Sequence, residues 1–150
     1  MPAPEISDHG MTEDERRAIE QDCLKLIATY AIAADHHDAE AFVGIFTEDG
    51  AWIRPKASLQ GHAALRAFMA QRPRDVVSRH ISTNALVEVT GPETARGVSY
   101  ATVYRHDGAV SGEAPLTGAD AIVEYHDDFV RTPAGWRIKA RRSQSIFRRS

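Results

Sequence analysis

The spacing of apolar residues changes midway along this 150-residue chain, and that change restricts the possible folds more than any other feature. Up to Gln71, apolar residues recur every three or four positions, which is the period of amphipathic helices. From Val76 onward, long segments rich in Val, Thr and Tyr have the composition of strands. Helices followed by a run of strands indicate one α+β domain, because an α/β fold would alternate the two.

Three helices are predicted in the first half of the chain, over residues 13–36, 39–46 and 61–71. Thr12 and Glu15 have the spacing of a capping box, which places the start of the first helix. Pro73 ends the third helix. A turn at 47–50 and a short strand at 51–53 are predicted between the second and third helices.

Four strands are predicted in the second half, over residues 76–90, 95–106, 119–131 and 135–147. Gly91 and Pro92 form the first turn, a loop rich in Gly and Pro covers 107–118, and residues 132–135 have hairpin composition. Strands joined in this order form an antiparallel meander. We therefore expect the three helices to pack on one face of a curved, mostly antiparallel sheet.

Composition excludes several classes of function. A net charge of −3 and a pI of about 6.1 give no electrostatic argument for nucleic acid binding. No apolar run approaches the roughly 20 residues of a membrane-spanning helix, and residues 1–11 are predicted to be a flexible lead-in that lacks signal-peptide features. We therefore expect a cytoplasmic protein with a single domain over residues 12–150.

The chain has one cysteine, Cys23, which falls within an apolar helical pattern. We predict a buried structural thiol there rather than a nucleophile. No Cys or His spacing of a zinc site is present, and the adjacent His36 and His37 do not share a helical face. The sequence therefore predicts neither a metal site nor a cofactor.

Asp35 falls among apolar residues when the first helix is projected down its axis. A carboxylate that faces a core is unfavourable unless another group pairs with it, so one interpretation is a pocket in which Asp35 holds a histidine. The other interpretation is that Asp35, at the end of the helix, turns outward and is solvated. The sequence leaves both interpretations open.

His80 belongs to the predicted strand over 76–90, where alternation places His80, Ser82 and Asn84 on one face. If that face looks at the helices, the three polar side chains line a cavity, and histidine suits proton transfer near neutral pH. If it looks outward, His80 is one more surface histidine in a chain that has seven. Asp35 and His80 are the candidate acid–base pair, because a carboxylate on one ring nitrogen fixes the tautomer.

Other side chains could complete a site. Tyr30 lies at the edge of the apolar arc, where its hydroxyl could polarise a carbonyl or assist a leaving group, or it is simply a core tyrosine. Arg141 and Arg142 are adjacent on the last strand, so one of them points inward and could bind an anionic or carbonyl group. Trp52 and Tyr104 either pack in the core or line a pocket.

Several short motifs follow one another along the chain in an order that is hard to obtain by chance. They are Tyr30-x4-Asp35, Ala41-Phe42-x3-Phe46-Thr47-x-Asp49-Gly50-Ala51-Trp52, Gly61-x3-Leu65-Arg66-x-Phe68, Arg79-His80-x3-Asn84 and Tyr125-x-Asp127-x-Phe129-Val130-Arg131-x3-Gly135-Trp136-Arg137-Ile138. Together they resemble the SnoaL-like branch of the NTF2-like superfamily over residues 12–147. The resemblance implies an α+β cone, with the N-terminal helices packed on a curved sheet.

Within that branch the chain is similar to scytalone dehydratase, hexachlorocyclohexane dehydrochlorinase and bile-acid 7α-dehydratase, which are cofactor-free lyases built around an Asp–His dyad. The resemblance maps the dyad onto Asp35 and His80 and places Tyr30 beside it. It implies an elimination in which His80 takes a proton from carbon next to a carbonyl. The implied substrate is a small apolar molecule, flat or polycyclic, with a hydroxyl and a carbonyl group.

We expect Trp52, Asn84, Tyr104 and Arg141 to contact the substrate. For the arginine this follows from the resemblance, because an arginine on the last strand of the family corresponds to Arg141, or to Arg142 if the strand carries a bulge. A second histidine on a later strand of scytalone dehydratase corresponds only loosely to His106.

The same superfamily also holds ketosteroid-isomerase-like isomerases, polyketide cyclases, epoxide hydrolases, dioxygenase small subunits and non-catalytic binding proteins. Fold does not decide among these functions. Exposed sheet surface in such cones is commonly covered by another copy of the chain, so the resemblance implies a homodimer or a homotrimer. Nucleic acid and membrane partners are not expected.

Overall fold

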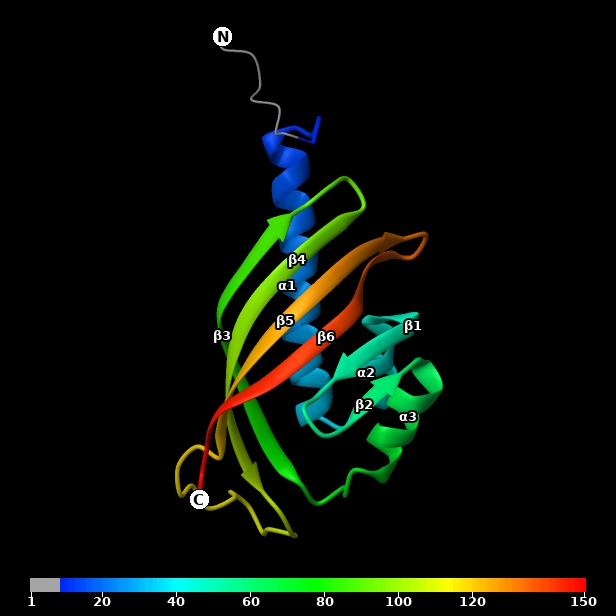
Figure 1. Cartoon of the computed structure of the whole chain (residues 1–150). Helices are drawn as coiled ribbons and strands as arrows, with labels where there is room; N and C mark the ends of the chain where they lie inside the picture. The colour runs from blue at the N-terminus through cyan, green and yellow to red at the C-terminus, as the bar shows by residue number, and fades with distance from the viewer. Residues whose placement is uncertain (1–8) are drawn as a thin grey trace.

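The computed structural model describes residues 9–150, which form three helices and one six-stranded sheet. The elements are α1 (Glu13–Asp35), α2 (Ala39–Gly44), β1 (Phe46–Ile53), β2 (Ser58–Gln60), α3 (His62–Gln71), β3 (Val77–Val89), β4 (Thr94–His106), β5 (Ala121–Thr132) and β6 (Gly135–Arg148). The strand order is β2-β1-β6-β5-β4-β3, and every neighbouring pair is antiparallel except β1 and β6 (Figure 1). The predicted α+β fold with a curved, mostly antiparallel sheet is confirmed.

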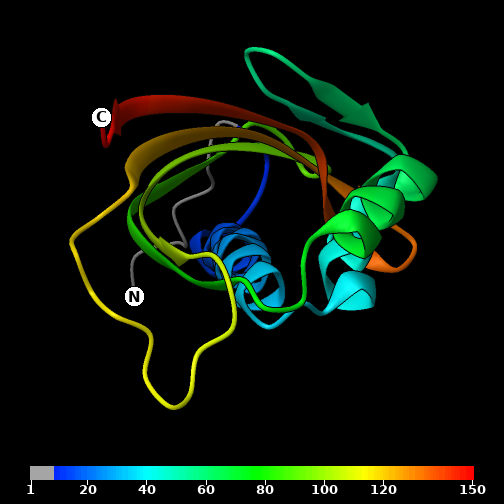
Figure 2. The same ribbon diagram turned by 90° about the horizontal axis from the view of Figure 1, so that it is seen from below.

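The long strands β3 to β6 curve around α1, and α2 and α3 lie together beside them (Figure 2). One face of α1 supplies apolar side chains to the core, among them Cys23, Ile27 and Tyr30. The predicted capping box starts this helix: the Glu15 backbone N–H donates to Thr12 Oγ1 at 3.2 Å, and the Thr12 N–H donates to Glu15 Oε2 at 2.8 Å. Cys23 is buried, and burial raises the pKa of its thiol to about 12.

The first sheet strand differs from the prediction. Residues 47–50, predicted as a turn, lie inside β1, and the segment Ser58–Gln60, for which no strand was predicted, forms β2. The Thr-Glu-Asp-Gly composition is typical of turns, but pairing of β1 with β6 and β2 overrides it. Position 50 requires glycine, because the Cβ of any other residue would lie only 2.9 Å from Phe46 Cβ. This close approach occurs where the register of β1 against β6 shifts.

The lead-in predicted over residues 1–11 falls mostly outside the described residues. Met11 is the exception, because it is buried and packs in the core. In the part of the chain that the structure describes, no helix is long and apolar enough to cross a membrane.

Candidate functional site

Asp35, the last residue of α1, and His80, on β3, lie in direct contact. His80 Nδ1 is 2.6 Å from Asp35 Oδ1, and the His80 backbone N–H donates to Asp35 Oδ2 at 2.9 Å. The Asp35 side chain is only 6% exposed. Of the two interpretations of Asp35, the structure therefore shows the inward, paired one.

The turn after α1 is tied to the start of β3 and so fixes this pair. His37 has a left-handed backbone conformation, with a φ of 56°, and its ring Nε2 is 2.8 Å from the carbonyl oxygen of Val76. The helix end and the strand are thereby joined immediately before Ser78 and His80. The contact of the His37 side chain with the Val76 carbonyl therefore holds the helix end and the strand together in addition to the dyad.

The Asp35 carboxylate is held in its ionised form. Burial raises its pKa, but hydrogen bonds from the His80 ring, the His80 backbone N–H and the Ser78 hydroxyl outweigh burial, so the pKa lies below its ordinary value. An ionised carboxylate only accepts hydrogen bonds, so His80 Nδ1 carries the proton and donates it. The neutral His80 ring then has its lone pair on Nε2, which is the atom that can take a proton.

This ionisation stabilises the fold above the unfolded-state pKa of Asp35, close to the ordinary value of 3.8, and the stabilisation is lost as pH falls through the lower folded-state pKa. We predict that the free energy of unfolding falls more steeply with acid below about pH 4 in the wild type than in Asp35→Asn. Urea unfolding across the acid range measures both slopes. Parallel curves for the two proteins would contradict the prediction.

A hydrogen-bond chain extends the pair away from His80. The Ser78 hydroxyl donates to Asp35 Oδ1 at 2.8 Å and accepts from Arg72 Nη2 at 2.7 Å. Sequence reasoning missed both residues. Ser78 could have been predicted from strand alternation, because it lies two positions before His80 and so shares its face of β3.

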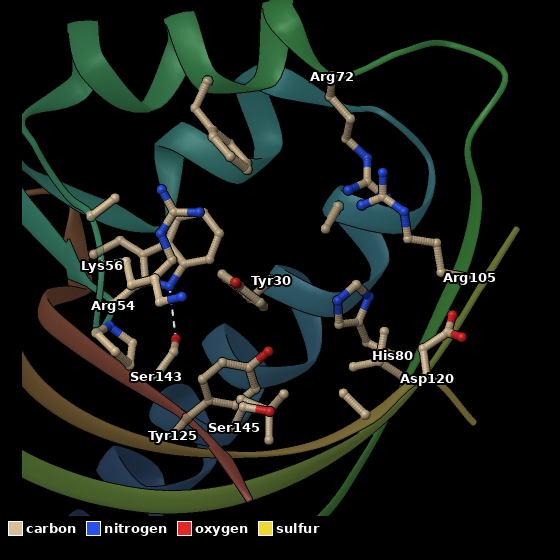
Figure 3. A pocket seen from close by; sticks show the side chains of 18 of the residues that line it. Tyr30, Arg54, Lys56, Arg72, His80, Arg105, Asp120, Tyr125, Ser143 and Ser145 are labelled. Atoms are coloured by element: carbon tan, nitrogen blue, oxygen red, sulfur yellow. Dashed lines mark hydrogen bonds between the residues drawn. The ribbon is translucent and has the colours of Figure 1, made fainter. Parts of the chain in front are cut away.

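His80 opens onto a cavity of about 660 Å³ (Figure 3). Its wall includes Tyr30 and Trp52, both predicted, together with the aromatic rings of Phe42, Phe68 and Tyr125. The Tyr30 ring stands edge-on to His80, with 6.4 Å between the ring centroids. Trp52 Nε1 donates to Ser143 Oγ at 2.8 Å, which fixes the indole against β6. Asp35, His80, Tyr30 and Trp52 are therefore brought together in one site.

Arg141 points inward, and Arg142 is exposed, which answers the question of which arginine faces the interior. Arg141 does not line the cavity, however. Its guanidinium forms a bidentate ion pair with Asp127, at 2.7 and 2.8 Å, and lies 4.2 Å from the Tyr30 ring centroid and 4.1 Å from that of Tyr125. Arg141 packs against the two tyrosines that line the cavity, and its charge is matched by the buried carboxylate of Asp127.

Asn84 and Tyr104 also lie outside the cavity. Asn84 is exposed and has a φ of 51°, at a register shift between Thr83 and Leu86 that interrupts the alternation from which its inward direction was predicted. Tyr104 pairs with Arg79, the exposed neighbour of His80, so it stands on the opposite face of the sheet. His106 pairs with Val77 and occupies that same opposite face.

The comparisons with known proteins agree with this architecture. A family model described as a SnoaL-like domain matches residues 15–142. A Mycobacterium tuberculosis protein of unknown function is 30% identical, with a TM-score of 0.75 over 88% of this chain and 74% of its own. An NTF2-like protein with a cystatin-like fold from Novosphingobium aromaticivorans is also 30% identical, with a TM-score of 0.75 over 87% of this chain and 83% of its own.

The hexachlorocyclohexane dehydrochlorinase LinA shares the fold at 16% identity, with a TM-score of 0.77 over 91% of this chain and 92% of its own. No curated protein sequence matches the chain. The cone predicted from the order of motifs is therefore the fold that this chain has.

Proposed function

The chain belongs to the SnoaL-like family of NTF2-like proteins, and from this we propose that it is a cofactor-free lyase of the dehydratase type. One observation carries the proposal: the Asp35–His80 pair lies at the wall of a cavity whose lining includes five aromatic rings. A cavity of about 660 Å³ has the size of small-molecule sites. LinA, which shares the fold, is by its name an enzyme of elimination chemistry.

In the proposed reaction, His80 Nε2 takes a proton from a carbon next to the substrate's carbonyl group. Asp35 keeps the imidazole in the required tautomer and stabilises the imidazolium that forms. The electron pair of the broken C–H bond forms the new double bond as the hydroxyl on the neighbouring carbon departs. The hydroxyl leaves as water when the imidazolium returns the proton, so the net change is the loss of one water.

Tyr30 is suited to donate a hydrogen bond during this step. Burial, followed by the proximity of Tyr125, raises the pKa of Tyr30 well above its ordinary value, so the hydroxyl stays protonated. Figure 3 shows its oxygen directed toward the interior of the cavity. There it can stabilise the developing enolate oxygen or the departing hydroxyl.

A screen of hydroxy-carbonyl compounds tests the proposed function. We expect a product lighter by one water, and slower turnover when deuterium replaces the hydrogen on the carbon next to the carbonyl. A product of unchanged mass with a shifted double bond would assign the same pair to an isomerase. A complete absence of turnover across polyketide-like, steroid-like and aromatic hydroxy-carbonyl compounds would count against an enzyme.

We predict that Tyr30→Phe lowers kcat by about 10²–10³-fold, the effect of losing one preorganised donor, while KM changes little. Tyr100→Phe is the matched control, because it removes the same hydroxyl from an exposed residue of β4 outside the cavity lining. Steady-state kinetics on the screened substrate measure both. Equal kcat values for the two variants would contradict the proposed role of the Tyr30 hydroxyl as a hydrogen-bond donor in the reaction.

The predicted homodimer or homotrimer stays a prediction, which one surface feature supports. Ile81, Thr102, Ile122 and Phe147 form a row across four strands on the face of the sheet opposite His80. Ile81 and Phe147 are 49% and 65% exposed. We expect Phe147→Asp to shift the mass measured by light scattering toward that of a single chain, whereas an unchanged mass would contradict this contact.

A further inference from the structure

The cavity concentrates positive charge, although the chain as a whole carries a net charge of −3. Five cationic side chains line it: Arg54, Lys56, Arg72, Arg105 and Arg148. The lining contains one carboxylate, Asp120, which is itself 3.5 Å from Arg149. Of the five cations, only Arg105 forms an ion pair with a carboxylate of residues 9–150, that of Asp107. A cleft lined by one sign of charge attracts ligands of the opposite sign.

Two of these arginines stand next to the acid–base pair. Arg72 follows α3, Arg105 lies on β4, and Figure 3 shows their guanidinium groups side by side on the His80 side of the cavity. Arg54 and Lys56 lie on the opposite side in the same view. Burial, followed by the charge of Arg105, lowers the pKa of Arg72 from its ordinary value. Two adjacent cations of this kind are stabilised by an anion between them.

Arg72 also has an unused donor. Its Nε is buried and has no hydrogen-bond partner among residues 9–150, while its Nη2 donates to Ser78. The carboxylate of the dyad, Asp35, already accepts hydrogen bonds from His80 and Ser78. A buried donor without an acceptor is unfavourable, so a ligand oxygen at this position would be stabilising.

We propose that the substrate carries a carboxylate, which Arg72 and Arg105 bind on the His80 side of the cavity. The planar guanidinium matches a carboxylate in shape and can donate two hydrogen bonds to it. The apolar body of the substrate then lies against the Tyr30 and Trp52 rings, with a C–H bond next to His80 Nε2. This inference rests on the proposed function in one respect, that the cavity holds the substrate, and it names the class: an apolar hydroxy-carbonyl compound bearing a carboxylate.

Arg54 is a less suitable anchor, although its Nε is also buried and without a partner in the described chain. Its guanidinium carbon lies 4.4 Å from the Trp52 ring centroid and 5.0 Å from that of Phe68, so the cation already packs against two aromatic rings. Cation–π contacts of this kind stabilise the Arg54 side chain without any bound anion. Arg54 therefore serves as the internal comparison for the experiment.

The test compares the binding of two probes of equal shape, naphthalene-2-carboxylate and naphthalene-2-carboxamide, by isothermal titration calorimetry at low salt. We expect the carboxylate to bind at least about tenfold more tightly than the amide, in line with the strength of charge-assisted hydrogen bonds. Arg72→Gln and Arg105→Gln should each reduce this preference, and the double variant should abolish it. The preference should also weaken as salt is added, because Arg105 is partly exposed.

Two variants serve as controls. Arg96→Gln removes a second arginine of β4 that is likewise paired with a carboxylate, Glu88, but lies outside this cavity, and it should keep the full preference. Arg54→Gln should keep the preference for the carboxylate even if both probes bind more weakly. Equal affinity for the two probes, no detectable binding of the carboxylate, or a preference that depends on Arg54 rather than on Arg72 and Arg105 would overturn the proposal.

The binding test can succeed or fail independently of the proposed lyase reaction. The titration measures binding at equilibrium and needs no turnover, so His80→Asn should keep the preference for the carboxylate. Carboxylate binding without any elimination chemistry would reject the lyase and retain the anion site. Elimination of water from neutral substrates, without a preference for the carboxylate probe, would retain the lyase and reject the anion site.

Discussion

His80→Asn should lower kcat by about 10²–10⁴-fold on the screened substrate, which is the range for removal of a positioned general base. Asparagine keeps the backbone N–H that donates to Asp35 Oδ2 and offers a side-chain N–H in place of the imidazole Nδ1–H. It has no basic nitrogen, so proton abstraction is lost while the local fold is kept. Steady-state kinetics, with circular dichroism to check folding, measure the effect.

The chain offers a matched control for this substitution. His126 on β5 forms a second histidine–carboxylate pair, with its Nε2 2.7 Å from Glu124 Oε1, but it is exposed and does not line the cavity. His126→Asn should leave kcat unchanged, because a histidine–carboxylate pair acts only where a substrate reaches it. A similar loss in both variants, or no loss in His80→Asn, would contradict the assignment of His80 as the base.

Arg141→Met should destabilise the protein by about 3–5 kcal/mol, the range for breaking a buried ion pair by removing one partner. The Arg141 and Asp127 side chains are 1% and 0% exposed, so the variant leaves an unmatched carboxylate in the core. The guanidinium also contacts the Tyr30 and Tyr125 rings, and these contacts are lost as well. Urea unfolding monitored by fluorescence gives the free energy of unfolding.

The neighbouring residue provides the comparison. Arg142 pairs with Asp128 at 2.9 Å, and their side chains are 53% and 50% exposed. Arg142→Met should therefore cost no more than about 1 kcal/mol. Replacing both buried partners, as in Arg141→Met with Asp127→Leu, should recover part of the loss, because no uncompensated charge remains. Equal destabilisation by Arg141→Met and Arg142→Met would show that burial does not determine the cost of breaking these ion pairs.

Local signals predicted much of the fold. The capping box at Thr12 and Glu15 gave the start of α1 to the residue, and Pro73 came just after the end of α3. The strand limits from β3 to β6 lie within one or two residues of the predicted ones. Local signals failed at β1, because its pairing with β6 depends on residues far along the chain, and turn-like composition cannot report such a partner.

For the site, helical and strand periodicity made Asp35, His80 and Tyr30 candidates but left their orientations open, and the family resemblance is what selected these three residues. Asn84 was predicted to point inward but does not line the cavity, because it lies at a register shift that strand alternation does not reveal. Alternation predicted that one of Arg141 and Arg142 points inward but not which one, and the partner of Arg141, Asp127 on the neighbouring strand, was not anticipated. Nothing in the local sequence reveals that Arg141 has its own counter-ion, whereas the half-buried Arg72 forms no ion pair with a carboxylate of residues 9–150.

The position of β6 has a consequence for the order of events during folding. This strand lies between β1 and β5 in the sheet, although it is the last strand in chain order. The hydrogen bond from Trp52 to Ser143 joins residues 91 positions apart, so closing the sheet at this point costs a large loop entropy. On a translating ribosome, the segment that forms β1, β2 and α3 emerges long before its partner strand exists. Trp52, which this segment contributes to the cavity wall, therefore lacks its β6 neighbour Ser143 until β6 has been synthesised.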